Sequence, residues 1–292
     1  MTDFGVSHGM FSLRRYWMDF ISKKLLADNS QEKDIVLFSK INELLKNIKS
    51  LNLTEGIHLS SVIRDDCLIK HGNRIIVLHS NTKNGSLDSY RIITRIIAEK
   101  IYRIHINYRG KNSVIFLWDD VCLCSGSVIT IGENGMLYLG RSFKCRNSIN
   151  INLGGINSTV CFGNNCNVGN MSIHAGDENN LEVLIGDCFL AALNLEMRAS
   201  DGHTIYSLDN PGTAINKPVF GIHVGRHVWA GMNVFLGKDV IIPADCIIGA
   251  GSLVTRRAFS PNSVIAGTPA TVIKTNVNWD AQNTEKFEQK KK

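Results

Sequence analysis

Residues 224–259 divide without a gap into six hexapeptides, and this feature constrains the fold more than any other in the 292-residue chain. The second position is glycine in four of the units, and the fifth is always small or β-branched. A short fixed period is the signature of a solenoid, in which stacked units bury one continuous core. The first position of every hexapeptide is aliphatic: Val224, Ala230, Leu236, Ile242, Ile248 and Val254.

The spacing predicts a triangular coil made from three hexapeptides. Each first residue would point inward, and a small residue after it would let the chain turn at the corner. Coils would stack at about the 4.8 Å spacing of paired strands. Weaker, interrupted units precede the clean run, so the solenoid is expected to begin near residue 112. Cys188 and Cys246 fall on inward positions of this register and are interpreted as small core residues rather than nucleophiles.

The part of the chain before the solenoid has helical periodicity instead. Apolar residues at helical spacing recur in residues 13–21, 37–48 and 87–101, with a strand-like stretch at 74–79. The helical stripes could bury one another or could form a docking or oligomerisation face. The expected fold is therefore mainly β, with three divisions: a basic, mostly helical N-terminal part (1–110), the solenoid (111–275) and a polar C-terminal tail (276–292).

The charge of the chain is unevenly distributed. Residues 1–110 contain 17 Lys and Arg against 11 Asp and Glu, whereas residues 111–292 contain 15 of each. The N-terminal excess could be ordinary solvated surface, or it could attract an anionic polymer or a phospholipid face. Without dense basic runs or interleaved aromatic residues, nucleic acid is not an expected partner.

Composition also bears on location and on metals. No apolar run reaches the roughly 20 residues of a membrane helix, and residues 1–20 lack the core of a signal peptide. We therefore expect a cytoplasmic protein. The eight cysteines are expected to be reduced thiols. Cys122 and Cys124 have no second pair at zinc-site spacing, so no metal is expected.

The hexapeptides resemble those of the hexapeptide-repeat acyltransferases, whose fold is a left-handed parallel β-helix. The similarity extends over more than half of the chain. Within that family, the branch that O-acetylates sugars is the most similar, notably the polysialic acid O-acetyltransferases of bacterial capsules. The motifs that carry this likeness are Asp201–Ser207, His227–Gly231, Gly249–Ser252, Ala266–Lys274 and Asn276–Trp279.

The resemblance implies an O-acetyltransferase that moves an acetyl group from acetyl-CoA to a hydroxyl of a bacterial surface polysaccharide, such as a capsule or an O-antigen. The sugar hydroxyl would attack the thioester directly in a ternary complex, and backbone N–H groups at the coil corners would stabilise the oxyanion. The resemblance also implies a homotrimer, in which the histidine of one subunit faces the coenzyme groove of the next. With a capsular acceptor, peripheral association with capsule-synthesis machinery or with the inner membrane is an open alternative to a freely cytoplasmic protein.

His203 matches the catalytic histidine of the family and would be the general base. An imidazole suits this role because its ordinary pKa, about 6.5, leaves it mostly neutral at cytosolic pH. Asp201 could orient this imidazole or could belong to an ordinary turn. Trp229 should face outward; the family places it beside the thioester and acceptor, and burial against residues 208–220 is the alternative.

The resemblance assigns acetyl-CoA to a groove between neighbouring coils. Gly231 and Ala250 would allow the pantetheine arm to approach the backbone closely. Two departures from the family pattern stand out, because Met232 replaces a small polar residue and Arg256 replaces a common lysine. Three residues occupy the positions that the family uses at the nucleotide end, where cations favour phosphates: Thr255, Arg256 and Lys274.

Other functions fit some of the same features. The enzyme could acetylate a small molecule, such as a free sugar, an antibiotic or serine. The solenoid could be a non-catalytic scaffold. The family also shares its coil with zinc-dependent hydratases, for which His203, His223 and His227 would be the candidate ligands, although the register makes the side chains of His223 and His227 diverge.

Overall fold

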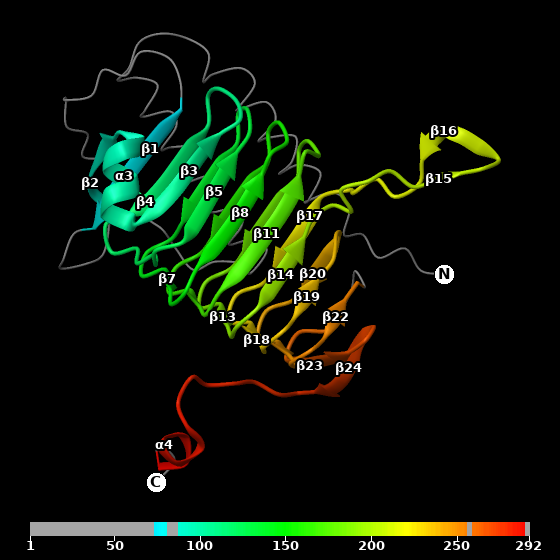
Figure 1. The fold of residues 1–292 in the computed structure, drawn as a ribbon. Helices are drawn as coiled ribbons and strands as arrows, with labels where there is room; N and C mark the ends of the chain where they lie inside the picture. The colour runs from blue at the N-terminus through cyan, green and yellow to red at the C-terminus, as the bar shows by residue number, and fades with distance from the viewer. Residues whose placement is uncertain (1–72, 81–86, 256–258, 290–292) are drawn as a thin grey trace.

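The regular aliphatic spacing produces short strands that gather into three mainly parallel sheets, so the predicted mainly-β class is confirmed. The structure, a computed structural model, describes residues 73–80, 87–255 and 259–289. The helical stripes expected in residues 13–21 and 37–48, and Arg256, lie outside the described residues. Successive coils place their strands side by side along the stack (Figure 1).

Each complete coil contributes one strand to each of the three sheets, which we name sheets A, B and C. Sheet A contains β2 (Leu87–Ile93), β1 (Arg74–Ser80), β4 (Val114–Trp118), β6 (Met136–Leu139), β9 (Thr159–Phe162), β12 (Glu182–Ile185), β17 (Gly221–Val224) and β20 (Val240–Ile242). Sheet B contains β3 (Ile104–Tyr108), β5 (Ser127–Ile131), β8 (Ile149–Leu153), β11 (Met171–Gly176), β14 (Leu195–Arg198), β19 (Phe235–Leu236) and β22 (Leu253–Val254). Sheet C contains β7 (Lys144–Cys145), β10 (Asn167–Val168), β13 (Leu190–Ala191), β18 (Trp229–Ala230), β21 (Ile247–Ile248), β23 (Ser263–Gly267) and β24 (Ala270–Thr275).

The clean hexapeptides form coils of three units each, as predicted. Val224 is in register with Ile242, Ala230 with Ile248, and Leu236 with Val254. All six of these first-position side chains are fully buried. Aliphatic residues therefore lie directly above one another inside the solenoid, and this interior forms the core.

The corners of the clean coils turn at a different position from the one expected. The fourth residue of the hexapeptide, rather than the small second residue, has the positive φ that reverses the chain. The second residue is glycine for another reason: a Cβ atom on Gly231 would lie 2.7 Å from the backbone nitrogen of Ala250 in the next coil. The fourth-position φ values are 54° at His227, 56° at Asn233, 59° at Asp239, 59° at Asp245 and 71° at Gly251.

The earlier coils are longer, which explains why the hexapeptide pattern is interrupted there. Val160 pairs with Val183, so this coil exceeds the length of three hexapeptides. The additional residues form corners that carry asparagine ladders. Asn134 donates through Nδ2 to Oδ1 of Asn157, and Asn157 donates likewise to Asn180, each over 3.1 Å. All three have a φ between 51° and 60°, a conformation that asparagine tolerates better than most residues.

The parallel sheets begin earlier in the chain than residue 112. β1 pairs with β4 and β3 pairs with β5, both in parallel, so residues 74–108 already contribute to sheets A and B. The helix predicted across 87–101 is wrong in its first half. Residues 87–93 form β2, which pairs antiparallel with β1, and only Arg95–Tyr102 form a helix, α3. Strand pairing at the edge of sheet A overrides the helical spacing in this segment.

The two cysteines assigned to the core differ. Cys246 is fully buried, as predicted. Cys188 is exposed, so its interpretation as a core residue is wrong. Counting from Ile185 as the first position, Cys188 is the fourth residue of its unit and has a φ of 58°, like the corner residues of the clean coils.

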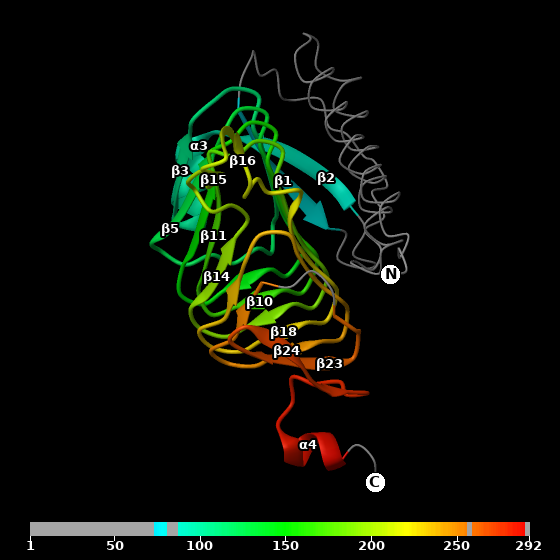
Figure 2. The same ribbon diagram turned by 90° about the vertical axis from the view of Figure 1, so that its right-hand side faces the viewer.

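An insertion between β14 and β17 forms an arm. Ile185 pairs with Val224, so the chain between these two residues is far longer than in the neighbouring coils. The strands β15 (Tyr206–Ser207) and β16 (Asn210–Ala214) pair within this insertion and project away from the stack (Figure 1). We define the arm as residues 201–217. After a 90° turn, the coils are seen one behind another (Figure 2). The C-terminal helix α4 (Thr284–Gln289) lies beyond the last coil.

None of the helices in the part of the chain that the structure describes has the length and apolar character that crossing a membrane requires.

Candidate functional site

The base of the arm is held to the solenoid by a polar network. Asn216 donates through Nδ2 to the Asp201 carboxylate and to the backbone carbonyl of His203, both over 2.8 Å. Its Oδ1 accepts from the backbone N–H of Ile205 over 2.8 Å. Lys238 reaches from the corner of the next coil and binds both the Asp201 carboxylate and, over 2.6 Å, the Asn216 carbonyl. The network therefore fixes where the arm leaves the coil.

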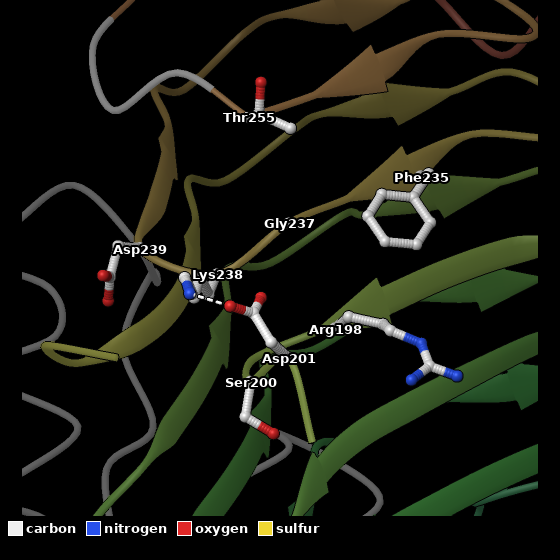
Figure 3. A pocket seen from close by; sticks show the side chains of 8 residues that line it. All are labelled: Arg198, Ser200, Asp201, Phe235, Gly237, Lys238, Asp239 and Thr255. Atoms are coloured by element: carbon white, nitrogen blue, oxygen red, sulfur yellow. Dashed lines mark hydrogen bonds and ion pairs between the residues drawn. The ribbon is translucent and has the colours of Figure 1, made fainter. Parts of the chain in front are cut away.

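A hollow of about 450 Å³ lies beside this network, at the corner between sheets B and A. Lys238 points toward Asp201 on its wall, with Phe235 and Arg198 on the sheet B side (Figure 3). Its lining combines two cations, two carboxylates, two hydroxyls and one aromatic ring, which suits a polar ligand better than an apolar one. The complete lining is Arg198, Ser200, Asp201, Phe235, Gly237, Lys238, Asp239 and Thr255.

The predicted catalytic residue, His203, is exposed at the base of the arm, two residues after Asp201 on the wall of the hollow. Its backbone carbonyl is fixed by Asn216. Asp201 directs its carboxylate to Lys238 and Asn216 rather than to the imidazole. The role of His203 stays a prediction, and the geometry favours a structural role for Asp201 over an orienting one.

The ionisation of Asp201 agrees with this structural role. Burial raises the pKa of its carboxyl, but the hydrogen bonds from Lys238 and Asn216 outweigh that effect and bring the pKa below its usual range. Asp201 is thus an anion near neutral pH, and its negative charge balances the cation of Lys238.

Trp229 lies on the outer side of sheet C, away from the hollow, and 40% of it is exposed. Trp279, from the segment after β24, lies against it with ring centroids 6.0 Å apart. The predicted outward orientation of Trp229 is confirmed. The aromatic ring that packs against Trp229 belongs to Trp279, not to residues 208–220 as in the alternative prediction.

Trp279 is held by two contacts with His227 at a coil corner. Its ring stacks on the His227 imidazole at 4.3 Å between centroids, and its Nε1–H donates to the His227 carbonyl over 2.9 Å. Nδ1 of His227 lies 2.9 Å from a carboxylate oxygen of Asp245 in the next coil. The stack joins two neighbouring coils and holds the C-terminal segment beside Trp229.

The residues that the resemblance assigned to coenzyme A separate into two places. Gly231 and Ala250 meet at the corner between sheets C and B, next to Trp229. Lys274 lies exposed on β24 of the same sheet C. Thr255 lines the hollow, at the following corner of the coil. In a single chain the predicted site residues therefore form two separate groups, one around Trp229 and one around His203, which we call the two candidate partial sites.

The histidines considered as metal ligands do not come together. His223 is buried on β17, 3.4 Å from Glu182, while His227 binds Asp245 and His203 stands on the arm. Across residues 73–80, 87–255 and 259–289, no group of three or more His, Cys, Asp and Glu side chains is placed to hold a metal ion.

Sequence reasoning missed several residues of the site. Lys238 and Asn216 anchor the arm, and Arg198 and Phe235 line the hollow. Lys238 is the third residue of its hexapeptide, a corner position whose side chain points outward, and this position was the available signal. Arg198 precedes the insertion, so only the sheet register between β14 and β19 brings it beside Phe235.

Comparison with known proteins gives structural neighbours only. No family model matches the chain, and no curated protein matches it. The crystal structure of the polySia specific acetyltransferase NeuO matches with a TM-score of 0.54 and 24% identity, over 65% of this chain and 88% of that chain.

Two other solved structures match less well in superposition. The polysialic acid O-acetyltransferase OatWY has a TM-score of 0.43 and 30% identity, over 61% of this chain and 92% of that chain. Galactoside acetyltransferase in complex with coenzyme A has a TM-score of 0.33 and 14% identity, over 95% of this chain and 93% of that chain.

The likeness to NeuO shows that the chain shares the fold of this acetyltransferase, and the resemblance predicted from the hexapeptides is confirmed at the level of the fold. The register of three hexapeptides per coil and the coil corners observed in this chain agree with that result. The chain has the fold of the hexapeptide-repeat acyltransferases.

Proposed function

We propose that the protein is an acetyl-CoA-dependent O-acetyltransferase acting on a hydroxyl of a bacterial surface polysaccharide. The observation that carries this proposal is the position of His203. It stands exposed at the base of an arm that Asn216 and Lys238 hold to the solenoid, two residues after Asp201, which lines the polar hollow, on a solenoid of the acyltransferase fold. NeuO, which shares this fold, is a polySia specific acetyltransferase.

The separation of the two partial sites supports a trimeric enzyme. His203 and Trp229 lie near different corners of the coil, so one chain does not bring them onto one substrate. Packing of copies around a threefold axis would place the arm of one subunit against sheet C of the next. The arm has apolar side chains suited to such a contact, with Leu208 88% and Ile215 65% exposed.

In the proposed reaction, the acceptor hydroxyl binds beside His203, whose imidazole takes the hydroxyl proton as the oxygen attacks the thioester carbonyl. The C–S bond of the thioester then breaks, and coenzyme A leaves as a thiolate that takes the proton back from the imidazolium. Acetyl-CoA would lie along the corner of Gly231 and Ala250, with its thioester near Trp229. Lys274 would face the nucleotide end, where its cation favours phosphate. The use of acetyl-CoA fits the cytoplasmic location expected from the sequence.

The experiment that tests this function measures acetyl-CoA turnover against a panel of purified capsular and O-antigen glycans. We expect His203→Ala to lower turnover by at least about a hundredfold, the usual scale of general-base catalysis, while circular dichroism and oligomeric state stay unchanged. His105→Ala is the matched control, because it removes another exposed histidine, on β3 at the far end of sheet B. Turnover that survives in His203→Ala would remove the proposed role.

Acceptor size separates the polysaccharide enzyme from the small-molecule alternative. A polymer enzyme should prefer long acceptors, whereas an enzyme for free sugars, antibiotics or serine should prefer the monomer. The same assay at rising salt concentration would show whether the basic N-terminal part attracts an anionic acceptor, because salt screens such attraction.

A further inference from the structure

The outer face of sheet B carries a row of polar side chains that crosses three consecutive coils. Residues alternate between the interior and the outer face along each strand, and the register aligns the outer ones. Asn152 pairs with His174, and His174 with Arg198; beside them, Asn150 pairs with Ser172, and Ser172 with Glu196. We call these six residues the sheet B track. All are exposed or half-buried.

The track leads directly into the hollow, whose wall includes Asp201 at the base of the arm. Arg198, at its end, lines the hollow. Glu196 pairs with Phe235 of the next coil, which also lines the hollow. Because coils stack at about 4.8 Å, the three coils of the track extend about 10 Å along the solenoid axis from the hollow.

The chemistry of the track suits hydroxyl groups. It presents amides, a hydroxyl and an imidazole, which both donate and accept hydrogen bonds. Its charges balance, since Nε of Arg198 donates to Glu196 over 2.8 Å, and Arg198 keeps further N–H donors for an acidic group.

The other two sheets offer no comparable surface. The outer side chains of sheet A are mostly apolar and are buried. On sheet C, the outer row begins with Lys144 and Asn167 but continues with Leu190 and Trp229. Of the described faces, sheet B alone connects a polar row to the hollow.

We propose that the sheet B track binds the sugar units that adjoin the acetylated one, so that the polysaccharide lies along the solenoid axis on sheet B. This inference rests on the proposed function and specifies how its acceptor is held. Arg198 faces an acidic group of the sugar unit nearest the hollow. Asn150 and Asn152 hydrogen-bond to hydroxyls of sugar units that lie about two coils further from the hollow.

The test uses the full-length protein and sialic acid acceptors of increasing length: a dimer, a tetramer and a long polymer. We expect the double variant Asn150→Ala/Asn152→Ala to be less active than the wild type, with a loss that increases as the acceptor becomes longer. The loss should reach about tenfold in kcat/KM for the polymer, as expected from two lost hydrogen bonds, and should appear in KM rather than kcat. Ser172→Ala, one coil nearer the hollow, should already affect shorter acceptors.

Asn167→Ala on sheet C is the matched control, because it also removes an outward amide from a neighbouring face. An equal loss in Asn167→Ala, or a loss in the double variant that does not depend on acceptor length, would contradict the proposal that the track binds the acceptor.

Direct binding of the unmodified polymer, measured by calorimetry, separates the two proposals. Polymer binding that the double variant weakens supports the track even when no acetyl transfer is detected. Undiminished polymer binding by the double variant contradicts it, whatever the activity of the wild type.

Discussion

The outer faces of sheets A and B are built on the same coils but have opposite chemistry. On sheet A, the register aligns Phe116, Tyr138, Cys161 and Leu184, all at most 3% exposed. On sheet B, the corresponding row is Thr130, Asn152, His174 and Arg198, which is polar and increasingly open toward the hollow.

This difference separates two uses of one backbone. A parallel strand gives every second residue to the interior, and the remaining residues are free to serve either stability or recognition. The apolar row of sheet A continues the core outward, because these side chains belong to the same buried cluster as the interior. The polar row of sheet B adds little buried apolar area and leaves a face for a ligand. Substitutions should therefore have opposite consequences on the two faces.

The largest difference is expected for a buried aromatic residue. Trp118→Ala on sheet A removes a fully buried side chain and should lower the free energy of unfolding by about 3–5 kcal/mol. The matched substitution on sheet B, Asn150→Ala, should change it by no more than about 0.5 kcal/mol. Urea unfolding of the full-length variants measures both. Similar values for the two would show that sheet A does not extend the core.

A smaller effect is expected for a single hydroxyl. Nε1 of Trp118 donates to Oη of Tyr138 over 2.9 Å, and both groups are buried. Tyr138→Phe leaves the indole N–H without its acceptor and should cost about 1–3 kcal/mol. Ser172→Ala on sheet B removes a hydroxyl from a half-buried site and is the control. A cost for Tyr138→Phe no larger than that of Ser172→Ala would contradict the comparison.

The clean hexapeptides made the interior predictable because their first positions repeat without exception. Val224, Ala230 and Leu236 are inward and in the predicted register. The outer faces were not predictable, since strand alternation shows that a residue faces outward but not what lies beside it. Both the buried face of sheet A and the position of Arg198 beside the hollow depend on coils longer than three hexapeptides. The lengths of these coils vary and follow no period in the sequence.

The candidate site was predictable only where a motif carried it. His203 and Trp229 came from the resemblance to a family, and both lie where substrate could reach them. Two residues fix the site: Asn216 at the end of the arm and Lys238 at the corner of the next coil, which meet only through folding. For Cys188 the prediction itself was wrong. The register of its interrupted unit was misplaced by one position, so an exposed corner residue was assigned to the core.

Thiol reactivity gives a further comparison of the two faces. Cys161 on sheet A is 2% exposed, and burial, followed by the nearby charges of Asp187 and Glu182, raises the pKa of its thiol. Ser172→Cys places a thiol at a half-buried position on sheet B. A maleimide reagent should modify the new cysteine at least about tenfold faster than Cys161, as followed by mass spectrometry of peptides. Equal rates at the two positions would show that the outer face of sheet A is open to solvent.

The smallest expected effect is a pH dependence confined to sheet B. Burial, and then the charge of Arg198, lower the pKa of His174. The unfolded chain therefore binds a proton at this residue more readily than the folded one, so stability should be constant above the ordinary histidine pKa of about 6.5 and should fall as pH drops below it. His174→Gln should remove this part of the decline, which urea midpoints between about pH 5 and pH 7 would measure. Ser172→Ala, its neighbour on the track, should retain the wild-type slope. An unchanged slope in His174→Gln would mean that His174 takes up its proton equally well in both states, and the outer face of sheet B would then resemble free solvent more closely than its half-buried side chains indicate.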